Sequence, residues 1–160
     1  MKTGLSELES ELVFIFDSDG QAIASEFWRT YKFATQYDMV LGERAERYDP
    51  PYRMFISKVF HLLVSLLFRL PVKDVDTGFR IVSKDVVRDV LPHIGALKYS
   101  FWAEFTIRAC KKGYSAIETP VRTAPRTQGK TTIYRWSKLP RIIVDQLVGL
   151  LRLVHDVRQG

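Results

Sequence analysis

Two aspartates follow directly after an apolar run near the start of the sequence. The run, residues 12–16, contains valine, isoleucine and two phenylalanines, a composition typical of a short strand buried on both faces of a parallel sheet. Ligands bind beyond the carboxyl ends of such strands. Asp17 and Asp19 could therefore offer oxygen ligands to Mg²⁺ or Mn²⁺ while a diphosphate supplies further oxygens, and Gly20 would let the backbone approach closely. A turn in which both aspartates bond to nearby amides is the simpler explanation of an isolated Asp-x-Asp, and it stays open.

Strand and helix patterns alternate around these aspartates and predict an α/β fold. Strands are expected at 12–16, 39–42, 79–82 and 114–121, and helices at 25–36, 53–70, 84–91, 101–112 and 136–157, after a helix tail and connector at 2–11. Pro120 favours an edge position for the last strand. Ser83 can cap the helix that follows it, and Gly113 suits the end of the helix before it.

Two of these helices carry unusually wide apolar surfaces. In 53–70 the polar residues from Ser57 to Arg69 fall within roughly 120° of arc, and apolar residues cover the rest. Helix 136–157 is amphipathic and begins with Trp136 among basic residues. Each helix is explained either by burial in the core or by a position in a bilayer interface. His61 lies in the polar stripe, so we do not expect it to ligate a metal.

The segment 122–135 is basic and rich in threonine, and it contains Arg122, Arg126, Lys130 and Arg135. It is typical of a surface loop that could close on a phosphate, and a solvated linker explains it equally well.

Length and composition indicate one domain with a real core. The chain has 160 residues, of which 46% are hydrophobic, and a net charge of +6 that favours anionic partners. Its single cysteine, Cys110, excludes an intramolecular disulfide and suits a reducing compartment. The start shows no signal peptide, and no uncharged run reaches about 18 residues. We therefore expect a cytoplasmic protein that does not cross a membrane.

Five segments, taken in order, resemble the later half of family 2 glycosyltransferases, and most of all the polyprenyl-phosphate (dolichyl-phosphate) mannosyl- and glucosyltransferases. They are Asp17-Ser18-Asp19-Gly20-Gln21, Leu41-Gly42-Glu43-Arg44, Val72-Lys73-Asp74-Val75-Asp76-Thr77-Gly78-Phe79-Arg80, Phe101-Trp102-Ala103-Glu104 and Arg126-Thr127-Gln128-Gly129. The resemblance runs over nearly the whole chain. It implies a GT-A-type α/β fold that binds a nucleotide sugar with a divalent metal and transfers the sugar, with inversion, to a polyprenyl or dolichyl phosphate.

The resemblance also implies a role for each matching residue. Asp17 and Asp19 match the metal ligands, and Gln21 matches a third ligand of some members. The residues that match phosphate or substrate contacts are Arg44, Arg53, Arg80, Arg126 and Lys130, while Asp74, Asp76 and Glu104 are acceptor-side or catalytic candidates. The resemblance also makes helix 53–70 an interface helix. From its wide apolar arc and the amphipathic pattern of 136–157, with flanking basic residues, we expect both helices to lie on a membrane, with the protein peripheral on the inner face.

The chain departs from the family pattern at its start. The nucleotide-holding βαβ half of the family, with its Pro-x-x-Asn-Glu-like and Asp-Asp-x-Ser-like segments, has no counterpart here, so residues 1–160 are expected to form one partial, N-terminally truncated domain. The strand at 12–16 would then lack neighbours on one side. A second copy or a separately encoded half could cover it, and we expect no sugar transfer by this chain alone.

Two other functions compete with the enzyme. One is a non-catalytic membrane-surface or interaction module. The other is a basic nucleic-acid binder, which is disfavoured because the aromatic residues follow core patterns and do not line a basic face. We therefore expect no nucleic-acid partner.

Overall fold

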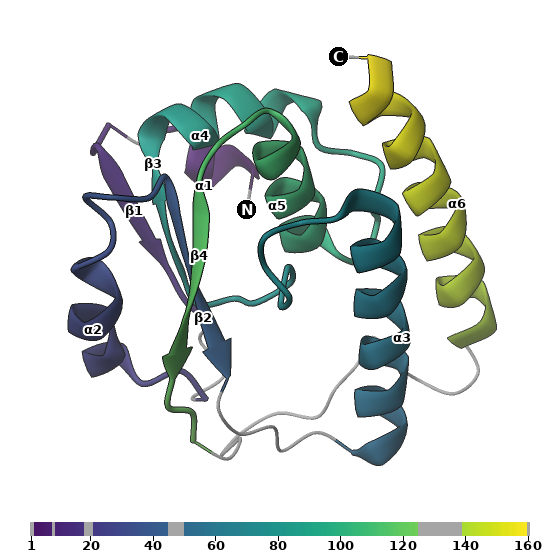
Figure 1. Ribbon diagram of the computed structural model, residues 1–160, viewed down its shortest axis with the longest axis horizontal. Coiled ribbons are helices and arrows are strands. Elements are labelled where there is room, and N and C mark those ends of the chain that lie inside the picture. The colour runs from purple at the N-terminus through teal and green to yellow at the C-terminus, as the bar shows by residue number, and fades with distance from the viewer. Residues whose placement is uncertain (1, 8, 18–20, 45–49, 125–138, 160) are drawn as a thin grey trace.

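The computed structural model describes residues 2–7, 9–17, 21–44, 50–124 and 139–159, and these form a mixed α/β fold (Figure 1). The strands are β1 (Leu12–Ile15), β2 (Met39–Arg44), β3 (Arg80–Ser83) and β4 (Ala116–Val121). The helices are α1 (Lys2–Ser6), α2 (Phe27–Tyr31), α3 (Pro51–Phe68), α4 (Lys84–Val90), α5 (Phe101–Lys111) and α6 (Leu139–Gln159), and short 3₁₀ turns lie at Ala24–Glu26 and Leu91–His93.

The four strands form one sheet in the order β1-β3-β2-β4. β3 runs antiparallel to both β1 and β2, whereas β2 and β4 are parallel. The prediction of a doubly buried parallel strand at 12–16 is wrong, because β1 lies at the edge of this mixed sheet and Phe16, just beyond it, is 45% exposed. β1 has a neighbour on one side only within the described chain. β4 occupies the opposite edge, as Pro120 predicted.

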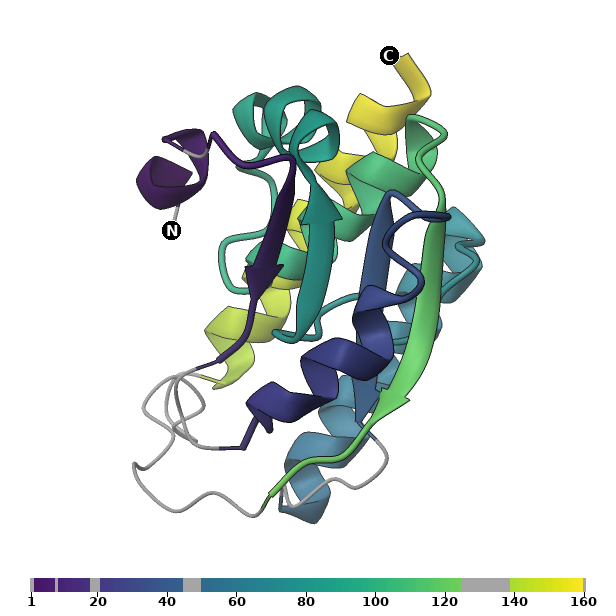
Figure 2. The same ribbon diagram turned by 90° about the vertical axis from the view of Figure 1, so that its left-hand side faces the viewer.

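Helices cover both faces of the sheet, and Figure 2 shows α2 in front of the strands with α3, α5 and α6 behind them. On the α2 face, the ring of Phe14 packs against those of Phe27 and Phe79 at centroid distances of 4.8 and 5.0 Å. Two apolar clusters fill the other side. One joins β1, β2 and β3 to α1, α4 and α5, and the other joins β2 to α3, α5 and α6.

The predictions for three of the helices had different outcomes. Helix α2 covers only five residues of the predicted 25–36, because the chain continues as turns from residue 32. Ser83 precedes α4 as predicted but makes no capping hydrogen bond through its side chain. Gly113 ends α5 with a φ of 95°, a conformation that suits glycine and confirms that prediction.

Helices α3 and α6 pack against each other and leave many apolar side chains uncovered. The most exposed are Phe55, Leu62 and Leu66 on α3 and Val144 and Leu151 on α6. Only 11% of α3 is buried, and its length and composition alone would also suffice to cross a membrane. The wide apolar arcs seen in the sequence are therefore surface, not core, over much of these two helices.

Candidate functional site

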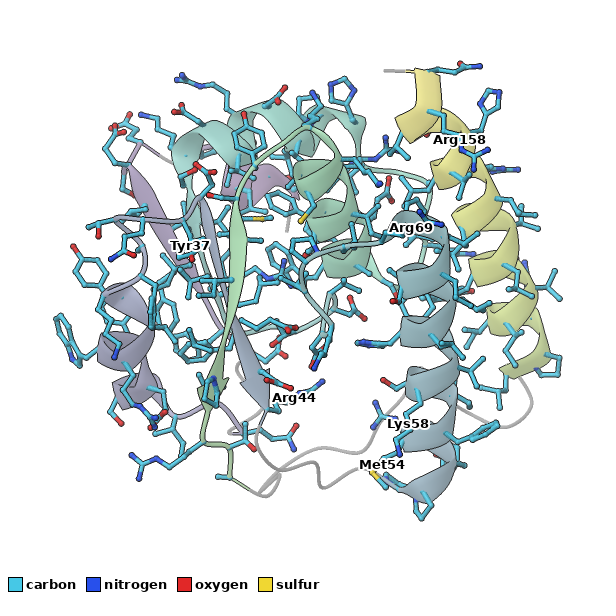
Figure 3. All side chains as sticks on the ribbon, in the orientation of Figure 1. Tyr37, Arg44, Met54, Lys58, Arg69 and Arg158 are labelled. Atoms are coloured by element: carbon cyan, nitrogen blue, oxygen red, sulfur yellow. The ribbon has the colours of Figure 1, made fainter. Side chains whose placement is uncertain are left out.

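A cavity of about 390 Å³ lies between the carboxyl ends of β1 and β2 on one side and helices α3 and α6 on the other. Figure 3 shows Arg44, at the end of β2, facing the part of α3 that carries Met54 and Lys58. The polar lining is Asp17, Gln21, Arg44, Arg53, Ser57, His61, Asp74, Asp76, Ser100 and Gln146. The apolar lining comes from the two helices and consists of Phe55, Ile56, Val59, Phe60, Leu63, Leu139, Ile142, Ile143, Leu147 and Leu150. The lining thus combines charged side chains, from the strand ends, the 74–76 segment and Arg53 of α3, with apolar side chains from α3 and α6.

Six of the residues predicted for the site line this cavity: Asp17, Gln21, Arg44, Arg53, Asp74 and Asp76. They come from segments up to 59 positions apart, between Asp17 and Asp76, so the fold brings together what the sequence keeps separate. Three predicted residues, Asp19, Arg126 and Lys130, lie outside the described residues. The remaining two, Arg80 and Glu104, lie elsewhere.

Asp17 sits directly beyond β1 against the backbone of Gly78. A Cβ atom added to Gly78 would lie 2.2 Å from the Oδ2 of Asp17, so only glycine leaves room for the carboxylate there. Asp17 and Gln21 both line the cavity, and their side chains carry oxygen atoms, the donor type that Mg²⁺ and Mn²⁺ prefer. Among the described residues no group of three or more His, Cys, Asp or Glu gathers in a metal-binding arrangement. The two described residues therefore match a hard cation in donor type only.

Asp74 lies in the cavity wall, is 4% exposed, and is flanked by two basic side chains. Its Oδ2 is 3.8 Å from Nη2 of Arg44, and its Oδ1 is 3.8 Å from Nε2 of His61. Arg44 also has a buried Nε that finds no hydrogen-bond acceptor in the described part of the chain. A buried donor without a partner is costly, so this edge of the guanidinium is suited to an anion that enters the cavity.

Asp76 is held at the start of α5, where its Oδ1 accepts a hydrogen bond of 3.1 Å from the backbone N–H of Ala103. Burial raises the pKa of this carboxyl to about 6, although the nearby Arg80 guanidinium opposes the shift. Near neutral pH the cavity therefore contains a carboxyl group whose charge is easily changed.

Arg80 is fully buried beneath the loop 73–78 and does not reach the cavity. Its guanidinium donates to the carbonyl oxygens of Thr77 and Val75 and to Oγ1 of Thr106, and it lies 4.2 Å from the ring centre of Trp102. Burial lowers the pKa of Arg80 to about 9 despite the nearby Asp76. The position indicates that Arg80 shapes the loop, whereas the sequence suggested contact with substrate phosphate.

Glu104 is also fully buried and away from the cavity. Its carboxylate accepts hydrogen bonds from the backbone N–H groups of Gly95, Ala96 and Leu97. It also forms an ion pair with Arg108, whose Nε lies 2.8 Å from Oε1 of Glu104. Burial alone would raise the pKa of Glu104, but these donors outweigh it and the pKa is lowered. Arg108 forms a second ion pair, with Asp156 of α6. Glu104 therefore connects α5 to the 95–97 turn directly and to α6 through Arg108.

Sequence reasoning missed two features of the wall. His61 was assigned to a polar stripe with no role, and Ser57 was not singled out, yet both line the cavity. The signal was present, because Arg53, Ser57 and His61 follow one another at intervals of four and thus share one face of a helix. Glu118 of β4 was missed as well. Its Oε1 accepts a hydrogen bond of 2.8 Å from the backbone N–H of Lys73 and another from that of Asp74, and these bonds hold the loop 73–78 against β4.

Comparison with known proteins gives one informative relative. The chain is 23% identical to a dolichyl-phosphate beta-glucosyltransferase of Trichomonas vaginalis, over 76% of this chain and 40% of that protein. It thus spans less than half the length of the relative. No protein-family model matches the chain. The similarity supports a glycosyltransferase-like relationship, and the mixed α/β sheet is compatible with a glycosyltransferase-like fold.

Proposed function

We propose that this chain carries the metal and acceptor side of a metal-dependent, inverting glycosyltransferase that moves a sugar from a nucleotide sugar to a polyprenyl or dolichyl phosphate. The observation that carries the proposal is the mixed lining of the cavity. Its charged part includes Arg44 and Arg53, and its apolar part comes from α3 and α6. A lipid phosphate has the same two parts, a charged head and an apolar tail.

The apolar part of the lining continues onto the outer surface. Phe55, Val59, Ile143 and Leu147 line it and are also 41% to 68% exposed. An isoprenoid tail could therefore extend from a membrane surface into the cavity in contact with these apolar side chains of α3 and α6. Burial of such a tail stabilises the complex by about 0.8 kcal/mol for each CH₂ group removed from water.

The charged part of the lining supplies what the transfer requires. Negative charge develops on a departing diphosphate as the sugar leaves, and cationic groups fixed in place stabilise that charge. Asp17 and Gln21, together with Asp19, would hold Mg²⁺ or Mn²⁺, and the bound ion would neutralise diphosphate oxygens. The acceptor phosphate is already ionised, so the reaction needs no strong base to activate it.

A second function is favoured by the exposed apolar faces alone. A module that binds a membrane surface without catalysis would also need α3 and α6, but it would not need Arg44 in the cavity. The variant Arg44→Met separates the two. We expect it to weaken binding of a short polyprenyl phosphate at least about tenfold, because a charge-assisted hydrogen bond is lost, and to leave membrane binding unchanged. Equal affinity of the variant and the parent for the lipid phosphate would favour the surface module.

A further inference from the structure

The ring of His61 is held in one orientation by the backbone. Its Nδ1 lies 2.7 Å from the carbonyl oxygen of Lys73. Because a carbonyl can only accept, Nδ1 must carry the hydrogen in this bond. The second nitrogen, Nε2, is therefore left to face the cavity.

The carbonyl that anchors His61 is itself fixed. Glu118 of β4 accepts the backbone N–H groups of both Lys73 and Asp74, so the loop is bound on one side by β4 and on the other by α3. The His61 side chain is 19% exposed and lines the cavity. The charged groups around it are Asp74, Asp76 and Glu118 on the acidic side and Arg44 and Arg53 on the basic side.

Two nitrogen atoms flank the Asp74 carboxylate at equal distances. Nε2 of His61 and Nη2 of Arg44 both lie 3.8 Å from its oxygens, beyond hydrogen-bond length. Neither nitrogen is hydrogen-bonded to Asp74. Nη2 of Arg44 is a donor, whereas Nε2 of a neutral ring that carries its hydrogen on Nδ1 is an acceptor and donates only when the ring is protonated on both nitrogens. A phosphate group that enters between them can therefore accept from Arg44 and share one proton with Nε2 of His61.

We propose that Nε2 of His61 forms a hydrogen bond with the phosphate group of the lipid acceptor, beside Arg44, through one proton carried by the ring or by the phosphate, while Nδ1–H keeps the ring in place. The proposal rests on the proposed function, because it assigns a binding residue to the acceptor site. His61 lies one helical turn beyond Ser57, on the face of α3 that also brings Arg53 and Ser57 to the cavity.

The variants His61→Asn and His61→Leu distinguish the contribution of Nε2 from that of Nδ1. The amide of His61→Asn reaches the place of Nδ1 and can still donate to Lys73, but it offers nothing at the place of Nε2. His61→Leu removes both. The probes are farnesyl phosphate and farnesol, measured by calorimetry, and the thermal unfolding midpoint of each variant is recorded beside the parent.

We expect His61→Asn to bind farnesyl phosphate about tenfold more weakly than the parent, to bind farnesol as the parent does, and to keep the parental unfolding midpoint. We expect His61→Leu to show the same loss of phosphate affinity and also a lower midpoint, because the link between α3 and Lys73 is gone. Unchanged affinity of His61→Asn for farnesyl phosphate would overturn the inference and leave His61 a structural link. A parent that binds farnesol as well as farnesyl phosphate would instead overturn the proposed function.

Discussion

The carboxylate of Asp17 occupies the space in which the side chain of residue 78 would begin. Because residue 78 is glycine, Oδ2 of Asp17 can lie 2.2 Å from the position of the missing Cβ. The 76–78 turn thus acts as a support that keeps Asp17 at the mouth of the cavity. Gly78 belongs to the Thr77-Gly78-Phe79-Arg80 segment, and its lack of a side chain leaves the space that the Asp17 carboxylate occupies.

Gly78→Ala tests this support. The added methyl group must push the Asp17 carboxylate aside, and we expect Mn²⁺ affinity to fall about tenfold, the scale seen when a group that orients a ligand is altered. Calorimetry with Mn²⁺ measures the effect. Gly95→Ala is the matched control, since nothing lies within 4 Å of a Cβ at that position.

The double variant Asp17→Ala, Asp19→Ala sets the lower limit of that experiment, and we expect it to bind no Mn²⁺. If the double variant binds Mn²⁺ like the parent, the metal site is not here. If Gly78→Ala binds like the parent while the double variant does not, Asp17 does not depend on the glycine.

Asp76 should make stability depend on pH in an unusual direction. Its pKa is about 6 in the folded protein, against an ordinary value of 3.8. Between these values the folded state holds the proton more tightly than the unfolded chain, so the free energy of unfolding should fall as pH rises from about 4 to about 6. Asp76→Asn cannot ionise and keeps an oxygen for the N–H of Ala103, and we expect it to gain ~1 to 3 kcal/mol relative to the parent between pH 4.5 and pH 7.

Urea unfolding of both proteins at the two pH values, in metal-free buffer, measures this difference. Glu7→Gln removes an exposed carboxyl and serves as the control. A gain for Asp76→Asn that is the same at pH 4.5 and pH 7 would show that the buried carboxyl does not titrate in this range.

The sequence predicted the α/β order and most elements because those signals are local. Strand 39–42, the glycine end of α5 and the edge position of Pro120 each follow from a few neighbouring residues. The direction of β1 could not be read in this way. An apolar run such as 12–16 suits a buried parallel strand and an antiparallel edge strand equally, and only its pairing with β3 separates them.

The site was predicted in part for the same reason. Aspartates and arginines that follow strands or stand in recognisable motifs can be identified from the sequence alone, and Asp17, Arg44 and Asp74 line the same cavity. Whether a charged residue of a motif faces the cavity or the core depends on the tertiary packing. Arg80 and Glu104 face inward and satisfy backbone groups, which no pattern of spacing reveals.

Flotation with anionic liposomes tests membrane association through α3 and α6. We expect the parent to float and Leu66→Glu or Leu151→Glu to remain largely in the soluble fraction, because each places a charge on a side chain that is 67% exposed on the apolar faces. Trp28→Glu is the control, since Trp28 is 72% exposed but lies on α2, on the other face of the sheet. A folded parent that does not float, or a Trp28→Glu variant that loses as much binding as the others, would contradict an interface role for these helices.

The central claim is that the cavity between β2 and α3 accepts a lipid phosphate, and calorimetric titration of the parent chain with farnesyl phosphate and with farnesol tests it most directly. The two ligands share the apolar tail and differ in the charged head, so their ratio reports on the charged part of the lining alone. The account predicts at least about tenfold tighter binding of the phosphate, with the preference lost in Arg44→Met. Equal binding of the two ligands, or a preference that survives Arg44→Met, would contradict it.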